Sequence, residues 1–201
     1  MTSRPPAVVA VSGNPRPGSR TLLAARTAAD RVAALLDAGT SGSPADGTDR
    51  VATVDLATLA GELLAPAHPA ADAALATLAA ADVAVVATPV YKASYTGLLK
   101  AFLDLYGPDG LAGVVVVPLV VSGNPAHALV GEVHLRPVLV ELGAVVPTRS
   151  LTVTEAQLAD LDAVLDAWLL RAAPALRRAT GLADADRVTA ADRAPEPAVS
   201  R

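Results

Sequence analysis

Five short apolar runs rich in β-branched residues recur along this chain of 201 residues, and longer segments rich in Ala and Leu separate them. The runs are apolar throughout rather than alternating, which is typical of strands buried on both faces of a parallel sheet. The runs occupy residues 7–11, 51–55, 82–88, 114–121 and 145–153, and the segments suited to helices occupy residues 21–38, 69–81, 96–106, 126–142 and 155–173. This pattern predicts a doubly wound α/β domain with right-handed crossovers and helices on both faces of the sheet.

Composition and charge exclude several classes of protein. Hydrophobic residues make up 52% of the chain, and a chain of this length buries a core without disulfides or a structural metal. The net charge of −4, with one Trp, one Phe and three Tyr, provides neither a basic stripe nor a platform for stacked bases, which excludes nucleic-acid binding. The longest near-continuous apolar run, residues 111–121, is far shorter than the roughly 20 residues of a membrane-spanning helix. With no cysteine and no signal-like core, the chain is expected to be cytoplasmic.

One domain is expected over residues 1–182. The tail, residues 183–201, mixes Asp, Arg, Pro and Ala without an apolar period and is expected to be disordered or a loosely docked arm. Residues 39–50 have the turn-rich composition of an exposed loop.

The segment after the first expected strand, SGNPRPGSRT from Ser12 onward, has the features of an anion site. Small polar residues and two arginines lie where the N–H groups at the start of a helix bind phosphate. The spacing of Gly13 and Gly18 imitates a nucleotide-binding P-loop, but Ser19 stands in place of its lysine and Arg20 in place of its Ser or Thr. The segment therefore predicts a phosphate site other than that of a nucleoside triphosphatase, and a plain capped turn is the alternative.

Both lysines, all three tyrosines and the phenylalanine fall within residues 91–106, directly after the third expected strand. From Tyr95 onward the large side chains recur at helical spacing, so most of this cluster is interpreted as core or as a stripe facing another subunit. Tyr91 and Lys92 precede that stripe and lie at the carboxyl end of the strand, where ligands of such sheets bind.

The segments SGNPRPGSRT and TPVYKASYTGLLKAFLDL together closely resemble the NADPH-dependent FMN reductases of the flavodoxin-like superfamily. Within that family they resemble the alkanesulfonate-utilisation type, which supplies reduced flavin to a partner monooxygenase. The similarity extends over residues 7 to about 153. It implies a flavodoxin-like five-stranded parallel sheet of order 2-1-3-4-5, hydride transfer from NADPH or NADH to FMN, and a homodimer or homotetramer with sites near a subunit interface.

The resemblance also implies thirteen FMN-binding residues, with no catalytic side chain and no metal site. The loop after the first strand would hold the phosphate through Ser12, Asn14, Arg16, Ser19, Arg20 and Thr21. The loop after the third strand would lie against the isoalloxazine ring through Pro89, Val90, Tyr91 and Lys92. The loop after the fourth strand would lie beside the ring through Ser122, Gly123 and Asn124.

The helix expected from residue 126 contains Pro137, which predicts a kink or bulge. Relatives of the sulfonate type carry an extra, often aromatic residue in this helix at the subunit interface. That place falls here on Val133, which departs from the pattern and leaves open whether His134 takes the role. His127 is a candidate for lining the nicotinamide pocket, and a local hydrogen-bonding role is its alternative.

Two other functions stay open at this point. One is a reductase of quinones, azo dyes or metal oxyanions with permanently bound FMN, and the other is a non-enzymatic flavodoxin-like electron carrier. The choice between NADPH and NADH also stays open, because Arg16, Arg20 or Lys92 are each candidates to contact the 2′-phosphate, and so is none of them.

Overall fold

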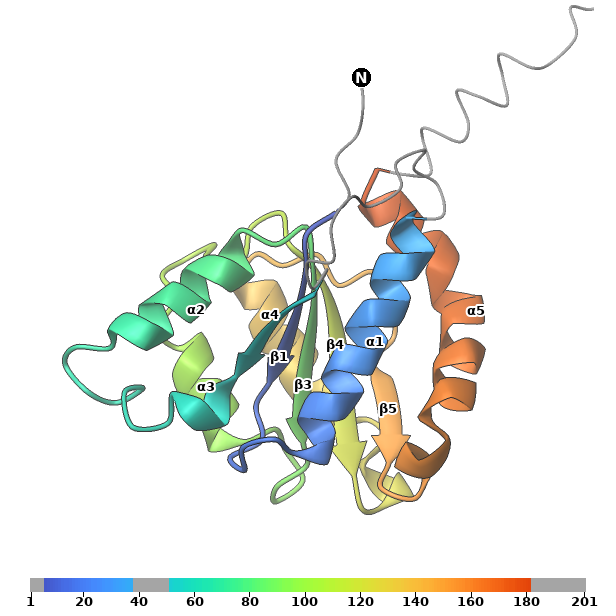
Figure 1. Cartoon of the computed structure of the whole chain (residues 1–201), viewed down its shortest axis with the longest axis horizontal. Coiled ribbons are helices and arrows are strands. Elements are labelled where there is room, and N and C mark those ends of the chain that lie inside the picture. The colour runs from blue at the N-terminus through green and yellow to red at the C-terminus, as the bar shows by residue number, and fades with distance from the viewer. Residues whose placement is uncertain (1–5, 38–50, 182–201) are drawn as a thin grey trace, which may run out of the picture.

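The computed structural model describes residues 6–37 and 51–181 and confirms a five-stranded parallel sheet of order β2-β1-β3-β4-β5 (Figure 1). The strands are β1 (Val8–Ser12), β2 (Val51–Asp55), β3 (Val83–Pro89), β4 (Val115–Ser122) and β5 (Leu151–Thr154). The predicted loop at residues 39–50 and the predicted tail at residues 183–201 lie outside the described residues. The sheet order changes direction between β1 and β3, which places a crevice at the carboxyl ends of these strands.

Helices cover both faces of the sheet, as predicted (Figure 1). On one face pack α1 (Arg20–Asp37) and α5 (Leu161–Ala179), and on the other pack α2 (Pro69–Ala79), α3 (Gly97–Leu103) and α4 (Arg136–Glu141). Three 3₁₀ turns, η1 (Leu56–Thr58), η2 (Pro125–His127) and η4 (Gln157–Asp160), and one π-helix, η3 (Gly131–Leu135), complete the described part. No helix among the described residues is both long enough and apolar enough to cross a membrane.

The core is built almost entirely from Ala, Val and Leu side chains, with Phe102 as its buried aromatic residue among the described residues. Along β1, Val8 and Ala10 face α1 and α5, whereas Val9 and Val11 face the opposite layer. The surface of α1 that meets the sheet is a row of buried alanines: Ala24, Ala25, Ala28 and Ala29. The first turn of α1 is thereby fixed beside the carboxyl end of β1.

The prediction for the fifth strand was wrong at its start. Residues 145–153 were expected to form it, but β5 begins at Leu151, and Val145 makes only an isolated bridge with Val115. The Arg136 guanidinium explains the difference, because its Nη1 donates to the Val146 carbonyl at 2.8 Å and its Nη2 donates to the Thr148 carbonyl. These contacts hold residues 146–148 as a loop.

The last helix was predicted at the right length but six residues too early, because residues 157–160 form η4 and α5 begins only at Leu161. Its expected end at residue 173 precedes Pro174, but α5 continues through Pro174 to Ala179. A proline removes one backbone donor from a helix, and the burial of Ala172 and Leu176 against the sheet offsets that loss.

The disturbance predicted around Pro137 is present. The expected helix over residues 126–142 is divided into η2, the π-helix η3 and α4, and Pro137 lies in the first turn of α4 directly after the π-helix. A proline ring clashes with the carbonyl four residues before it, here that of Val133, and the wider π turn at that place relieves the clash. The side chains of Val133 and His134 are both exposed.

Candidate functional site

A cavity of about 460 Å³ lies at the carboxyl edge of the sheet, and we call it the carboxyl-edge cavity. Three loops surround it: the β1 loop (residues 13–19), the β3 loop (residues 90–96) and the β4 loop (residues 123–124). Of the thirteen predicted residues, nine line it: Asn14, Arg16, Ser19, Arg20, Thr21, Pro89, Val90, Tyr91 and Gly123. Segments far apart in the sequence therefore meet around one cavity.

Side chains within the β1 loop hold it in shape. The Asn14 Oδ1 accepts from the Arg16 N–H at 3.0 Å, and the Asn14 Nδ2 donates to the Thr21 Oγ1 at 3.0 Å. The Ser19 Oγ accepts from the Leu22 N–H at 3.2 Å and so caps α1. The capped turn and the anion site are thus compatible, because one loop presents its helix start and its polar side chains to the cavity.

Asp55, which the sequence reasoning missed, ties the β1 loop to β2. Its Oδ2 accepts from the Gly18 N–H at 3.1 Å, and Gly18 has a φ of +62°. A residue with a Cβ rarely adopts this backbone conformation, so glycine suits the turn. The Asp55 carboxylate occupies one loop N–H and leaves the helix start of α1 for a ligand.

The two arginines of the β1 loop differ in their pairing. The Arg20 Nη2 lies 2.8 Å from the Glu155 Oε2, and both side chains are more than half exposed. Arg16 is exposed and has no carboxylate partner among the described residues. Glu155 and Leu158 line the cavity from beyond the end of β5, and they were also missed. Their position just after a strand end is the signal that would have found them.

A buried threonine joins the β1 and β3 loops. The Thr96 Oγ1 donates to the Gly13 carbonyl at 2.6 Å and accepts from the Leu99 N–H at 3.1 Å, which caps α3. The Thr96 N–H in turn donates to the Thr88 Oγ1 at 3.2 Å. Gly13 fits beneath this joint because a Cβ there would lie 2.7 Å from the Leu99 Cβ.

The β3 loop is a tight hairpin turn that presents Tyr91. The N–H groups of Tyr91 and Ser94 donate to each other's carbonyls at 2.9 and 3.1 Å, and Lys92 and Ala93 between them have φ values of +51° and +60°. Two central residues with positive φ define a type I′ turn, which seldom contains lysine and alanine. Tyr91 lines the cavity, whereas Lys92 is exposed and lies outside its lining.

Three further predicted residues shape the loops and do not line the cavity. The buried Ser12 Oγ accepts from the Asn14 N–H at 3.4 Å. The buried Ser122 Oγ donates to the Asn124 carbonyl at 2.9 Å, and the Asn124 Oδ1 accepts from the Ala126 N–H at 2.9 Å. His127 also lies outside the lining, in η2. Within the described ranges, no group of carboxylates and histidines is placed to hold a metal ion.

This chain is similar to several known proteins. The family model described as NADPH-dependent FMN reductase matches residues 6–157. "NADH-dependent FMN reductase SfnF" of Pseudomonas fluorescens is 34% identical over 182 residues, which cover 90% of this chain and 93% of that protein. "FMN reductase (NADPH)" of Escherichia coli is 52% identical over 64 residues, 32% of this chain, and the match spans only 34% of that protein's length. The solved apo structure of "NADH:FMN oxidoreductase (EMOB)" has a TM-score of 0.61 and 32% identity, and the match covers 82% of this chain and 89% of that one.

Proposed function

Because this chain belongs to the family of NADPH-dependent FMN reductases, we propose that it transfers hydride from NADPH or NADH to FMN bound in the carboxyl-edge cavity. One observation carries the proposal: the arginine-bearing start of α1 and the Pro89–Tyr91 segment line the same cavity. The first suits a phosphate dianion, and the second suits a planar ring.

The residues present fit the phosphate of FMN. The cavity lining contributes the guanidinium groups of Arg16 and Arg20, the hydroxyl groups of Ser19 and Thr21 and the amide of Asn14. Glu155 is the one carboxylate among the described residues that line the cavity, and Arg20 neutralises it. A cavity of about 460 Å³ is also within the usual size of cofactor sites.

The protein's contribution to hydride transfer is positioning. When bound, FMN supplies the isoalloxazine ring that accepts the hydride of the nicotinamide. Pro89, Val90 and Tyr91 would hold that ring through apolar contact and backbone polar groups, and Ser12, Ser122 and Asn124 would keep the loops beside it in place. No general acid or base is required, since the reaction depends on stacking the two rings at short distance.

Lys92 and His127 keep more peripheral proposed roles. Lys92 adds a positive charge beside Tyr91, where it would meet the reductant's phosphates, and His127 would lie at the nicotinamide side. The names of the relatives include both NADPH-dependent and NADH-dependent enzymes, so either reductant fits the proposal.

The proposed setting is a cytoplasmic homodimer or homotetramer that supplies reduced FMN to a partner monooxygenase. Exposed apolar side chains along residues 129–145 support self-association, and among them are Leu129, Val133, Val140 and Val145. The absence of cysteine supports the location.

Titration of the protein with FMN, followed by flavin fluorescence, tests the proposal. Arg16→Gln should weaken FMN binding by about 1–3 kcal/mol, because a charged hydrogen bond to the phosphate is lost. Arg178→Gln, an exposed change at the far end of α5, is the matched control. Equal FMN affinity in the Arg16 variant and the control would contradict the phosphate site.

Steady-state kinetics with added FMN separates this function from a reductase with permanently bound flavin. NAD(P)H oxidation that saturates with free FMN and releases reduced FMN supports the proposal. A protein that retains FMN through gel filtration and passes electrons only to a quinone, azo dye or metal oxyanion would contradict it. A protein that binds FMN but oxidises neither nucleotide would be an electron carrier.

A further inference from the structure

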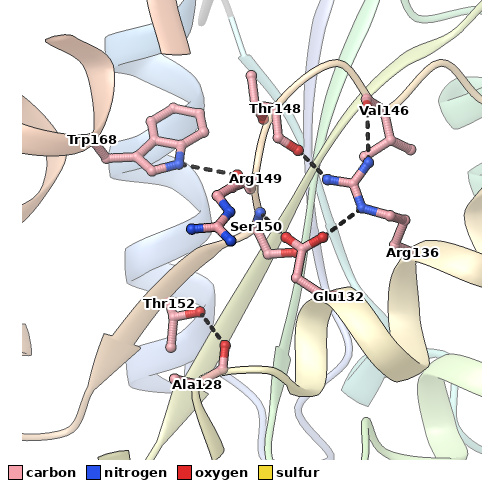
Figure 2. A network of polar contacts seen from close by, with 9 residues as sticks. All are labelled: Ala128, Glu132, Arg136, Val146, Thr148, Arg149, Ser150, Thr152 and Trp168. Atoms are coloured by element: carbon pink, nitrogen blue, oxygen red, sulfur yellow. Dashed lines mark hydrogen bonds and ion pairs between the residues drawn. The ribbon is translucent and has the colours of Figure 1, made fainter. Parts of the chain in front are cut away.

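A second cavity, of about 670 Å³, lies beside the edge strand β5 and faces α5, on the other side of η4 from the carboxyl-edge cavity. We call it the β5-edge cavity. Its walls are residues 147–152, the start of η4 and the inner side of α5. Figure 2 shows part of it, with Trp168 and Arg149 on the side of α5. The proposed FMN site uses none of its residues.

The charge in this cavity is uncompensated. Arg149 and Arg171 line it, and no aspartate or glutamate does. Neither guanidinium has a carboxylate partner among the described residues, and Figure 2 draws no contact from the Arg149 guanidinium. The nearby Arg136 differs, because its guanidinium is bound by Glu132 and two carbonyls. The Arg171 Nε donates to the Ala167 carbonyl at 3.4 Å, and the remaining guanidinium nitrogens of the two cavity arginines are available to an anion.

An aromatic wall stands next to these charges. Trp168 is half-buried, and its Nε1–H donates to the Arg149 carbonyl at 3.1 Å, which fixes the plane of the indole. Aliphatic side chains, including Val164 and Ala172, complete the lining. A planar ring stacks on an indole and on a guanidinium alike, so the wall suits an aromatic ligand.

The backbone of β5 favours a small molecule over an added peptide strand. The Ser150 N–H donates to the Glu132 Oε1 at 2.6 Å, and the Thr154 N–H donates to the Gln157 Oε1 at 2.9 Å. The Glu155 N–H donates to the Ser122 carbonyl of β4, so the alternate residues 150, 152 and 154 point their N–H groups outward. Side chains thus accept from two of these three outward N–H groups. A peptide strand added at this edge would find only the Thr152 N–H free to pair with it.

We propose that the β5-edge cavity binds a planar aromatic ring carrying one carboxylate, sulfonate or phosphate group. The ring would lie against Trp168, and the anionic group would contact Arg149 and Arg171. This site is separate from the FMN site, and it stands or falls independently of the proposed reductase activity.

The single tryptophan makes the test direct, because ¹⁵N-labelled protein has one indole N–H resonance and it reports on this cavity. Protein saturated with FMN, so that the carboxyl-edge cavity is blocked, is titrated with naphthalene-2-sulfonate, naphthalene-2-carboxylate and phenyl phosphate. At least one of them should shift the Trp168 resonance saturably. Arg149→Gln and Arg171→Gln should each weaken that binding about tenfold, the loss of one charged hydrogen bond.

Three controls make the outcome decisive. Arg178→Gln lies on α5 outside the cavity and should bind like the unaltered protein. Naphthalene-2-sulfonamide, a neutral ring of the same shape, and methanesulfonate, an anion without a ring, should bind at least tenfold more weakly than the aromatic anion. No saturable shift with any of the three anions, or equal binding by the sulfonamide or by the arginine variants, overturns the proposal. If FMN does not bind at all, the indole still reports on this cavity, and only the proposed function fails.

Discussion

The two cavities beside η4 both contain two arginines, and of these four Arg20 alone has a carboxylate partner among the described residues. In the carboxyl-edge cavity, Arg20 pairs with Glu155 and the β1 loop is tied internally and to its neighbours. In the β5-edge cavity, Arg149 extends from the loop before β5 and Arg171 from α5, and neither has a carboxylate partner in the part of the chain that the structure describes. The first is a preorganised frame, which binds with little loss of conformational entropy, and the second relies on its charge.

The largest expected effect comes from breaking the frame at Gly13. Gly13→Ala would place a Cβ 2.7 Å from the Leu99 Cβ, and separating the β1 loop from α3 should cost about 2–3 kcal/mol. FMN affinity should fall accordingly, and binding at the β5-edge cavity should not change. Urea denaturation and FMN titration measure the two effects. Gly61→Ala, where a Cβ meets no atom within 4 Å, is the control.

Thr96→Val should have the next largest effect. The change keeps the shape of the side chain but removes the hydroxyl that caps α3 and donates to the Gly13 carbonyl. We expect the free energy of unfolding to fall by about 2 kcal/mol. FMN binding should weaken with it. Thr77→Val, which removes an exposed hydroxyl from α2, provides the comparison. Equal stability of the two variants would mean that Thr96 does not join the loops.

Glu132→Gln tests the surroundings of the β5-edge cavity, because the Glu132 carboxylate accepts a hydrogen bond from the N–H of Ser150, which lines that cavity. Burial disfavours the charged form of Glu132, but hydrogen bonds from Arg136 and Ser150 outweigh it and hold the pKa of this carboxyl below its ordinary value. The carboxylate therefore stabilises the fold above the unfolded pKa of about 4.3, and this stabilisation is lost as the pH falls through the lower folded pKa.

The Gln variant should consequently be about 1–1.5 kcal/mol less stable at pH 7, with the difference shrinking at pH 3. Urea denaturation at the two pH values measures this. A difference that is the same at both would exclude the charge as its cause. FMN affinity should not change, because Glu132 lies outside the carboxyl-edge cavity.

The smallest effect is expected from Glu155→Gln. Removing the carboxylate frees Arg20 and takes a negative charge from beside the phosphate site, so FMN should bind tighter by about 0.5 kcal/mol, the usual value of an exposed ion pair. The gain should decrease in 0.5 M salt. Weaker binding in this variant would show that Glu155 helps to orient Arg20 rather than competing for it.

Sequence patterns predicted the strands well because burial on both faces leaves a continuous apolar run. Four strands lie within one residue of their predicted bounds, and the start of β5 is the exception. The apolar run that begins at Val145 does not indicate that the carbonyls of Val146 and Thr148 accept hydrogen bonds from the Arg136 guanidinium instead of pairing with a neighbouring strand. Such a contact depends on the π turn that aims Arg136, which local periodicity does not encode.

The sequence indicated which loops lie around the carboxyl-edge cavity, but not the side-chain contacts that hold these loops. The carboxyl-end rule and the family motifs indicated three loops that the structure brings to one cavity. They did not indicate that Asp55 and Glu155 bind Gly18 and Arg20, which are far away in the sequence. Ser12 and Ser122 are predicted to contact FMN, and the sequence did not indicate that their hydroxyls bond to loop backbone. A residue's type indicates what it can bind, and only the fold decides which partner is nearest.

The alanine row on the inner side of α1 has a consequence for how the helix folds. Burying alanine orders no side-chain rotamers, so this contact forms with little loss of conformational entropy beyond that of the backbone. The larger buried side chains of α1, Val32 and Leu36, come later in the helix, so its first turns meet the sheet through methyl groups alone. The first turns of α1 therefore lie close to the sheet. Their position fixes the end of the β1 loop that leads into the helix.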